Sequence, residues 1–238
     1  MLSTTKAIVL GAIRYSDADL IVKCYTQIGL KSYMLKGVLK SKKGKLKTAY
    51  FQPLTHLELV ANHNNKGNLN FIKEVKISYP YNTIPFNIVK QTMVLFLSEV
   101  LGKSIYEEEE NSQLFEYIET ALIWLDTNDE VANFHLLFLL NLTKHLGFYP
   151  EKECTQSLFF DLEEGRFTNS IPRNNIVTTE NLTHLKALLG INFEGLYTLK
   201  FNGLIRQSIL DILIRYFELH LPGFHRPKSL AILKTVFE

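Results

Sequence analysis

The spacing of apolar residues changes once along this chain, near residue 80, and the change limits the folds open to it. Before it, short runs of β-branched, Leu and aromatic residues alternate with segments that contain Gly, Asn, Asp or Lys, which predicts strands joined by turns. The runs cover residues 6–15, 20–26, 30–38, 54–61 and 69–79. Five short strands favour a small closed barrel, either an OB-fold, which commonly binds oligonucleotides, or an SH3-like barrel.

Beyond residue 80, apolar residues recur every three or four positions, as on the buried face of a helix. The helical stripes cover residues 89–101, 114–125, 131–142, 181–189 and 203–221. Pro85 suits the first turn of the first of these helices, because a proline there loses no hydrogen bond.

A short hairpin interrupts the helical pattern: residues 158–162 and 166–168 flank the turn segment Glu163-Glu164-Gly165. We therefore expect an α+β protein. An N-terminal five-stranded OB-fold barrel at 1–80 forms a nucleic-acid-binding domain, and a mainly α-helical domain at 81–238 carries an inserted hairpin module around 150–180.

The net charge of +2 conceals an uneven distribution. Residues 1–80 contain 12 Lys and one Arg against four acidic side chains, a net of +9, and the remaining 158 residues carry 13 basic and 20 acidic side chains, a net of −7. A basic half joined to an acidic half indicates a polyanion-binding unit fused to a second function. The alternative is that the lysines only keep the N-terminal half in solution.

Seven lysines lie within 17 residues, with no acidic residue among them, and the segment Lys40-Ser41-Lys42-Lys43-Gly44-Lys45 is too polar for a strand interior, which predicts a loop off the barrel. Lysines on such a loop would bind phosphates without reading bases, so binding should weaken steeply with salt. The seven lysines are Lys31, Lys36, Lys40, Lys42, Lys43, Lys45 and Lys47. The segment is no P-loop, because six residues separate Gly37 from Gly44 where four are needed, and Leu46 replaces the Ser or Thr that holds magnesium. Tyr33 and Tyr50 are candidates for stacking on bases, although most aromatic residues of this region belong to the core.

No constellation of residues points to catalysis or to a cofactor. The histidines lack the spacing of a metal site on a helix, and the consecutive carboxylates of residues 107–110 point in different directions, as at a solvated helix end. A nuclease would need clustered carboxylates, and the N-terminal half offers only Asp17, Asp19, Glu58 and Glu74. The lack of a catalytic constellation predicts that the protein is no enzyme. Two distant cysteines and no apolar stretch long enough to span a membrane indicate a cytoplasmic protein.

Several short motifs occur in a fixed order along the whole chain. They are Ala7-Ile8-Val9-Leu10, Tyr15-Ser16-Asp17-Ala18-Asp19, Tyr25-Thr26, Gly29-Leu30, Lys36-Gly37-Val38 with Ser41, Leu54-Thr55-His56-Leu57-Glu58-Leu59, Leu146-Gly147-Phe148-Tyr149-Pro150 and Lys228-Ser229-Leu230. Together they resemble the RecO family of bacterial DNA repair proteins.

The resemblance implies a protein that binds single- and double-stranded DNA and anneals complementary strands. It would act with RecR to help RecA replace single-stranded-DNA-binding protein (SSB), and would contact the acidic, apolar C-terminal tail of SSB. Lys36 and Lys40 match positions for DNA contact, and charge adds their neighbours. The full predicted DNA interface is Arg14, Lys31, Tyr33, Lys36, Lys40, Lys42, Lys43, Lys45 and Lys47.

For the SSB tail, basic residues beside apolar helix faces are candidates: Lys144, Arg206 and Arg215, whose ordinary role would be surface charge. Zinc-bearing relatives carry paired cysteines after the Gly-Phe/Tyr-x-Pro landmark. This chain keeps only Cys154 there, too few for a four-ligand site, so we expect no zinc and a hairpin held by apolar packing. A second function fits the same barrel, that of an RNA- or ribosome-associated binding protein, because phosphate contacts do not distinguish the sugars.

Overall fold

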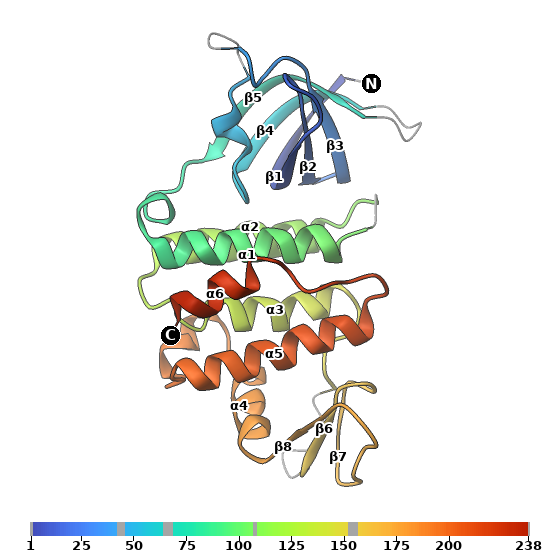
Figure 1. The fold of residues 1–238 in the computed structure, drawn as a ribbon, viewed down its shortest axis with the longest axis vertical. Coiled ribbons are helices and arrows are strands. Elements are labelled where there is room, and N and C mark those ends of the chain that lie inside the picture. Colours follow the sequence, from blue (N-terminus) through green and yellow to red (C-terminus); the bar gives the residue numbers. More distant parts are fainter. Residues whose placement is uncertain (1, 42–45, 64–68, 107–108, 152–156, 238) are drawn as a thin grey trace. The chain divides into compact units, whose positions relative to one another are not determined.

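A computed structural model of the chain describes residues 2–41, 46–63, 69–106, 109–151 and 157–237. The chain forms two compact units, Met1–Asp126 and Thr127–Glu238, each of which combines strands with helices (Figure 1). The first unit thus contains the predicted barrel and the two helices that follow it, whereas the boundary predicted from the sequence lies at residue 80.

The first unit begins with a five-stranded antiparallel sheet: β1 (Leu2–Arg14), β2 (Leu20–Thr26), β3 (Gly29–Leu35), β4 (His56–Asn62) and β5 (Phe71–Tyr79), in the order β3-β2-β1-β4-β5. The two edges meet through a parallel bridge between Tyr33 and Asn70. The Met34 N–H donates to the Asn70 carbonyl and the Asn70 N–H to the Ser32 carbonyl, both at 2.9 Å. The sheet therefore closes on itself, and the predicted OB-fold barrel is confirmed.

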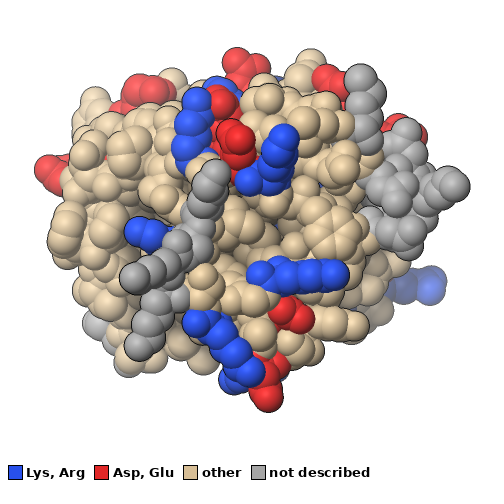
Figure 2. Space-filling view, turned by 90° about the horizontal axis from the view of Figure 1, so that it is seen from above, with Lys and Arg blue, Asp and Glu red and all other residues tan. Residues whose placement is uncertain are grey.

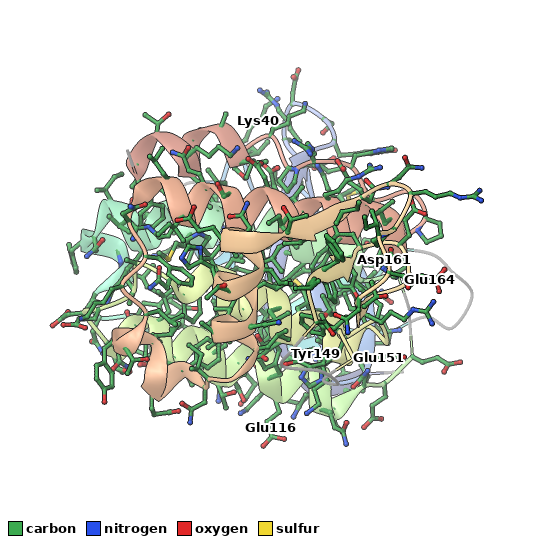
Figure 3. All side chains as sticks on the ribbon, turned by 90° about the horizontal axis from the view of Figure 1, so that it is seen from below. Lys40, Glu116, Tyr149, Glu151, Asp161 and Glu164 are labelled. Atoms are coloured by element: carbon green, nitrogen blue, oxygen red, sulfur yellow. The ribbon has the colours of Figure 1, made fainter. Side chains whose placement is uncertain are left out.

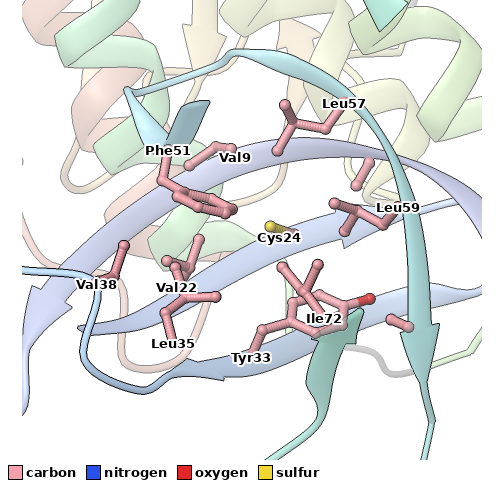
Figure 4. Packing of buried hydrophobic residues seen from close by; sticks show 12 residues of the cluster. Val9, Val22, Cys24, Tyr33, Leu35, Val38, Phe51, Leu57, Leu59 and Ile72 are labelled. Atoms are coloured by element: carbon pink, nitrogen blue, oxygen red, sulfur yellow. The ribbon is translucent and has the colours of Figure 1, made fainter. Parts of the chain in front are cut away.

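Alternate side chains of these strands fill the barrel (Figure 4). Val22 and Cys24 of β2 meet Tyr33 and Leu35 of β3, and Phe51, from the short 3-10 helix η1 (Thr48–Phe51), packs against the same cluster. Burial raises the pKa of the Cys24 thiol far above its ordinary value, which keeps it protonated and unreactive. Residues two apart on β2 and β3 therefore share the buried face, as a period-two pattern predicts.

Two helices, α1 (Ile88–Ser104) and α2 (Ser112–Thr127), pack on the outer face of the barrel. The Lys23 ammonium of β2 donates to the Gly102 carbonyl in the last turn of α1 at 2.6 Å. The neighbouring Tyr25 ring lies 6.1 Å from the ring of Phe115 in α2, centroid to centroid. Because both side chains point away from the barrel core, the helices cover the outside of β2.

The start of α1 differs from the prediction. Pro85 lies in a separate 3-10 turn, η2 (Ile84–Phe86), and α1 begins after Asn87, whose side chain accepts hydrogen bonds from the Val89 and Lys90 N–H groups. The asparagine satisfies the free N–H groups of the first turn, so it sets the boundary rather than the proline.

A fully buried carboxylate, Asp126 at the end of α2, fastens this turn. It accepts backbone N–H groups of Asn82, Thr83 and Ile84 at 2.9–3.0 Å. Burial acts to raise the pKa of Asp126, but these hydrogen bonds outweigh it and hold the pKa below its ordinary value. The buried Lys90 ammonium completes the arrangement by donating to the Thr83 hydroxyl at 2.7 Å.

The second unit is mainly helical: its elements are α3 (Phe134–His145), β6 (Phe159–Asp161), β7 (Arg166–Thr168), β8 (Ile176–Thr178), α4 (Thr179–Leu189), η3 (Phe193–Thr198), α5 (Gly203–His220) and α6 (Leu230–Val236). The predicted hairpin is confirmed as β6–β7, and a third strand, β8, extends it in the order β7-β6-β8. β8 and α6 were not expected. The seven residues of α6 are too few to display a helical period, and β8, unlike β6 and β7, is not joined to its neighbour by a turn segment such as Glu163-Glu164-Gly165.

Apolar packing holds the hairpin module. The Phe160 ring lies 4.8 Å from that of Phe167 and 5.9 Å from that of Tyr216 on α5, centroid to centroid. The Tyr216 hydroxyl donates to the Phe148 carbonyl at 2.7 Å. Cys154 lies outside the described residues. Within the residues that are described, no group of three or more His, Cys, Asp or Glu side chains could hold a metal ion, and no helix is long and apolar enough to span a membrane.

Candidate nucleic-acid interface

The β1–β2 turn and the segment after β3 are tied together by one carboxylate, that of Asp19. It accepts the Gly37 N–H at 2.7 Å through one oxygen and the Ser16 hydroxyl at 2.9 Å through the other. Gly37 has a φ of +69°, a conformation that glycine adopts without strain. A backbone bond from the Leu39 N–H to the Ala18 carbonyl at 2.9 Å adds a second tie. We call these two segments, residues 14–19 and 36–41, the basic rim.

Lys36 and Lys40 project from this rim, and both side chains are exposed. The Gly37 N–H, the Ser16 hydroxyl and then the charges of the two lysines lower the pKa of Asp19, so its carboxylate is charged at neutral pH. The charged Asp19 carboxylate thus holds the segment that bears Lys36 and Lys40 in place, and both lysine side chains remain exposed to solvent, where phosphates can reach them.

The predicted arginine and the other predicted lysines are spread over several segments of the chain. Arg14, at the end of β1, is exposed and forms an ion pair with Asp17 at 3.3 Å. Lys31 of β3 lies opposite Cys24 of β2. Lys36 follows the last residue of β3, five residues after Lys31. Lys47 is exposed at the start of η1. The remaining three, Lys42, Lys43 and Lys45, lie outside the described residues.

Tyr33, predicted to stack on a base, belongs to the barrel core instead. Its side chain is 0% exposed and its hydroxyl forms a hydrogen bond with His63 at 2.9 Å. A base needs an open ring face, so the prediction for Tyr33 is wrong. Tyr50 also packs against the core cluster and is half-buried. The sequence reasoning missed Phe71, which is 48% exposed, although the alternation in β5 that buries Ile72 turns Phe71 outward.

Part of the positive charge of the N-terminal region is engaged inside the first unit. Lys6 pairs with Glu119 of α2 at 3.0 Å, and Lys76 with Glu58 at 2.7 Å. Figure 2 shows Lys and Arg side chains spaced apart on one face, with Asp and Glu beside several of them. The charge counted from the sequence therefore overstates what is available to a polyanion, and the described lysines of the basic rim carry the candidate site.

The three candidates for binding the SSB tail also differ in whether their charges are engaged inside the unit or available to a partner. Lys144 is exposed in the last turn of α3. Arg206 donates to the Phe201 carbonyl and lies 5.1 Å from the centroid of the Phe237 ring, and Arg215 donates to the Asn175 side chain at 3.0 Å. The two arginines thus help to fasten α5 to its neighbours, whereas Lys144 is open to a partner.

The hairpin module presents carboxylates, which disfavour contact with phosphates. Asp161 accepts the backbone N–H groups of Glu163 and Glu164 at 2.9 and 3.2 Å, and the Glu151 N–H donates to the Gly165 carbonyl at 3.0 Å (Figure 3). Four acidic residues therefore gather around one turn. Arg166 lies opposite Asp161 and is exposed, but the acidic residues outnumber it at this turn, which disfavours a nucleic-acid backbone there.

Comparison with known proteins decides the family. Residues 1–81 match the family model described as "Recombination protein O N terminal", and residues 85–231 match "Recombination protein O C terminal". The chain belongs to the RecO family. The prediction from the short motifs is confirmed, and the basic rim lies within the N-terminal RecO model.

Relatives match over full length. The DNA repair protein RecO of Flavobacterium psychrophilum is 48% identical over 235 residues, covering 98% of each chain. That of Christiangramia forsetii is 46% identical over 238 residues and that of Phocaeicola vulgatus 36% identical over 240 residues, each covering all of both chains. The two RecO family models meet between residues 81 and 85, while the compact units divide after Asp126.

Proposed function

We propose that this RecO-family protein is a non-enzymatic mediator of DNA repair. It binds single- and double-stranded DNA, anneals complementary strands and, together with RecR, helps to load RecA onto DNA coated with SSB. The observation that carries the proposal is the basic rim of the OB-fold, where Asp19 fixes the segment that bears Lys36 and Lys40. The name DNA repair protein, borne by relatives that match the whole chain, supports it.

Annealing requires no covalent bond to be formed or broken. Two complementary strands repel each other through their phosphates, and ammonium groups placed between the backbones reduce that repulsion, so base pairing proceeds. Because lysines contact phosphates and not base edges, annealing is independent of sequence. Its rate should fall steeply with ionic strength, since counterions compete for the same phosphates.

The second unit would recruit this activity to coated DNA in the cytoplasm, at the nucleoid. The C-terminal tail of SSB is acidic and apolar, so it needs a cation beside an apolar helix face. Lys144 is the most accessible of the predicted residues, with Arg206 and Arg215 partly engaged inside the unit. Loss of tail-peptide capture in Lys144→Glu, with unchanged binding to bare DNA, would support this assignment.

Charge reversal of the rim tests the DNA-binding function. Lys36→Glu with Lys40→Glu should weaken binding to single-stranded DNA roughly tenfold or more and slow annealing in parallel. Arg173→Glu with Lys200→Glu, two exposed residues of the second unit, makes the same change in net charge and is the control. Equal affinities of the two variants would refute the assigned surface.

The alternative, a protein that binds RNA or the ribosome, uses the same cations. We favour DNA because the relatives are named as DNA repair proteins. Competition between single-stranded DNA and RNA of equal length and sequence separates the two functions: a strong preference for RNA would reverse the choice.

A further inference from the structure

The outer face of the barrel carries a row of apolar side chains that crosses adjacent strands. In the register of the sheet, Ile13 of β1 lies opposite Ile21 of β2, and Ile21 lies opposite Met34 of β3. Met34 and Phe71 are the residues that follow the bridged pair Tyr33 and Asn70, so they are neighbours on the outside, since that pair points inward. The row Ile13–Ile21–Met34–Phe71 therefore crosses four strands.

Solvent reaches this row. Ile13 is 65% exposed and Phe71 is 48% exposed, while Ile21 and Met34 are half-buried. Single exposed apolar side chains are ordinary on a protein surface, but a row that continues across adjacent strands indicates a ligand surface. By contrast, the outward Tyr25 is 1% exposed because α2 covers it.

A cation stands directly beside the aromatic end of the row. Lys36 follows Met34 by two residues, and its ammonium lies 5.5 Å from the centroid of the Phe71 ring. A nucleotide presents the matching pair of groups, an anionic phosphate and a flat base, so both can be bound together when an ammonium adjoins a ring. A neutral peptide has no anionic group for the Lys36 ammonium, so it would use only the Phe71 ring.

We propose that Phe71 and Met34 form a stacking platform for an unpaired base of single-stranded polynucleotide, next to the phosphate held by Lys36. The platform rests on the proposed function and adds base contact to it. In a duplex the bases are already stacked on one another, so the platform serves single strands alone. Stacking would contribute a part of the binding free energy for single strands that does not depend on salt, since stacking releases no counterions.

The test uses the full-length protein, oligothymidylate, and an abasic oligodeoxynucleotide of the same length, which keeps the phosphates and lacks the bases. Phe71→Ala should weaken binding of oligothymidylate roughly five- to hundredfold and leave binding of the abasic strand and the salt dependence unchanged. Phe71→Trp should restore the affinity, and oligothymidylate should quench its added fluorescence. Phe86→Ala, at a residue 88% exposed and outside the row, is the matched control and should bind both strands as the wild type does.

The outcomes separate the two proposals. Wild-type binding of both strands with an unchanged Phe71→Ala variant overturns the platform alone, as does an equal loss on both strands, which would mean a structural or phosphate role for Phe71. Failure of the wild-type protein to bind either strand overturns the proposed function and the platform with it.

Discussion

The Gly37 N–H donates a hydrogen bond of 2.7 Å to the Asp19 carboxylate, which fastens the segment of Lys36 and Lys40 to the β1–β2 turn. An acidic residue thus lies at the centre of a surface proposed to bind an anion. Two opposite effects on affinity follow from this position: the charge of Asp19 repels phosphate, and its hydrogen bonds hold the lysines that attract phosphate.

Asp19→Ala discriminates between the two effects. If charge alone mattered, removing an anion would strengthen DNA binding; because the hydrogen bonds position Lys36 and Lys40, we expect affinity for single-stranded DNA to fall, roughly fivefold. Fluorescence anisotropy at fixed salt measures the change. Asp17→Ala is the control, since that exposed carboxylate pairs only with Arg14 among the described contacts, and its loss should leave binding equal or tighter. Tighter binding in both variants would contradict a positioning role for Asp19.

His56 should make the barrel unit sensitive to acid. It is 1% exposed, neither ring nitrogen has a hydrogen-bond partner among the described residues, and burial lowers its pKa to about 4. Because the folded pKa lies below the ordinary value of about 6.5, the stabilising effect of neutral His56 is complete above that value and is lost as the pH falls toward 4. Its contribution at pH 5 amounts to about 2 kcal/mol of lost stability.

His56→Phe tests this, because a phenyl ring keeps the contacts with Tyr79 and Tyr81, whose centroids lie 5.9 and 5.4 Å away. Urea unfolding at pH 7.5 and pH 5 should show a smaller difference in the free energy of unfolding for the variant than for the wild type. Identical pH dependence of the two proteins would rule out His56 as the source.

Gly165 should be the most sensitive glycine of the second unit. It has a φ of +68°, and a Cβ atom there would lie 2.5 Å from the Tyr216 hydroxyl oxygen, which is already bonded to Phe148. Gly165→Ala combines backbone strain with a steric clash and should cost about 2–4 kcal/mol of stability.

Two matched glycines isolate the components. Gly147→Ala has the strain alone, since its φ is +85° with no atom within 4 Å of the added carbon, and should cost about 1 kcal/mol. Gly190→Ala has neither a positive φ nor a close contact, so it should be nearly neutral. Thermal unfolding that ranks Gly147→Ala as equal to Gly165→Ala would show that Tyr216 moves aside.

We expect the purified protein to contain no stoichiometric zinc, because the hairpin module is held by Phe160, Phe167 and Tyr216 and the sequence keeps only one cysteine of the paired ligands. Elemental analysis after extensive dialysis is the measurement. A chelator should leave the melting temperature unchanged, and one tightly bound equivalent of zinc would contradict the expectation.

The sequence predicted the barrel well, because alternation in β2 and β3 follows directly from having one filled side. It misplaced Tyr33 because alternation alone does not say which of two faces is the inside: Tyr33 and Cys24 share the inner face, while Phe71 takes the outer one. The role of Asp19 was also missed, since a hydrogen bond between segments 18 residues apart leaves no periodic signal.

The number of lysines in the sequence overestimates the positive charge available to a ligand, for a related reason. Lys23 and Lys90 each count as a full positive charge in the sequence, but one donates to the Gly102 carbonyl and the other is fully buried and donates to the Thr83 hydroxyl. Whether a cation is free depends on partners distant along the chain, which local composition does not reveal.

Because Lys23 contacts α1 and Tyr25 contacts α2, we do not expect the five strands to fold stably without the two helices. A fragment cut at the end of the N-terminal RecO model, at residue 81, would expose the Tyr25 ring to water and would lack Asp126, whose carboxylate accepts a hydrogen bond from the Tyr79 hydroxyl. Such a fragment should aggregate, whereas one continued through α2 should stay monomeric. In this chain the barrel and its two helices would then unfold together as one cooperative block.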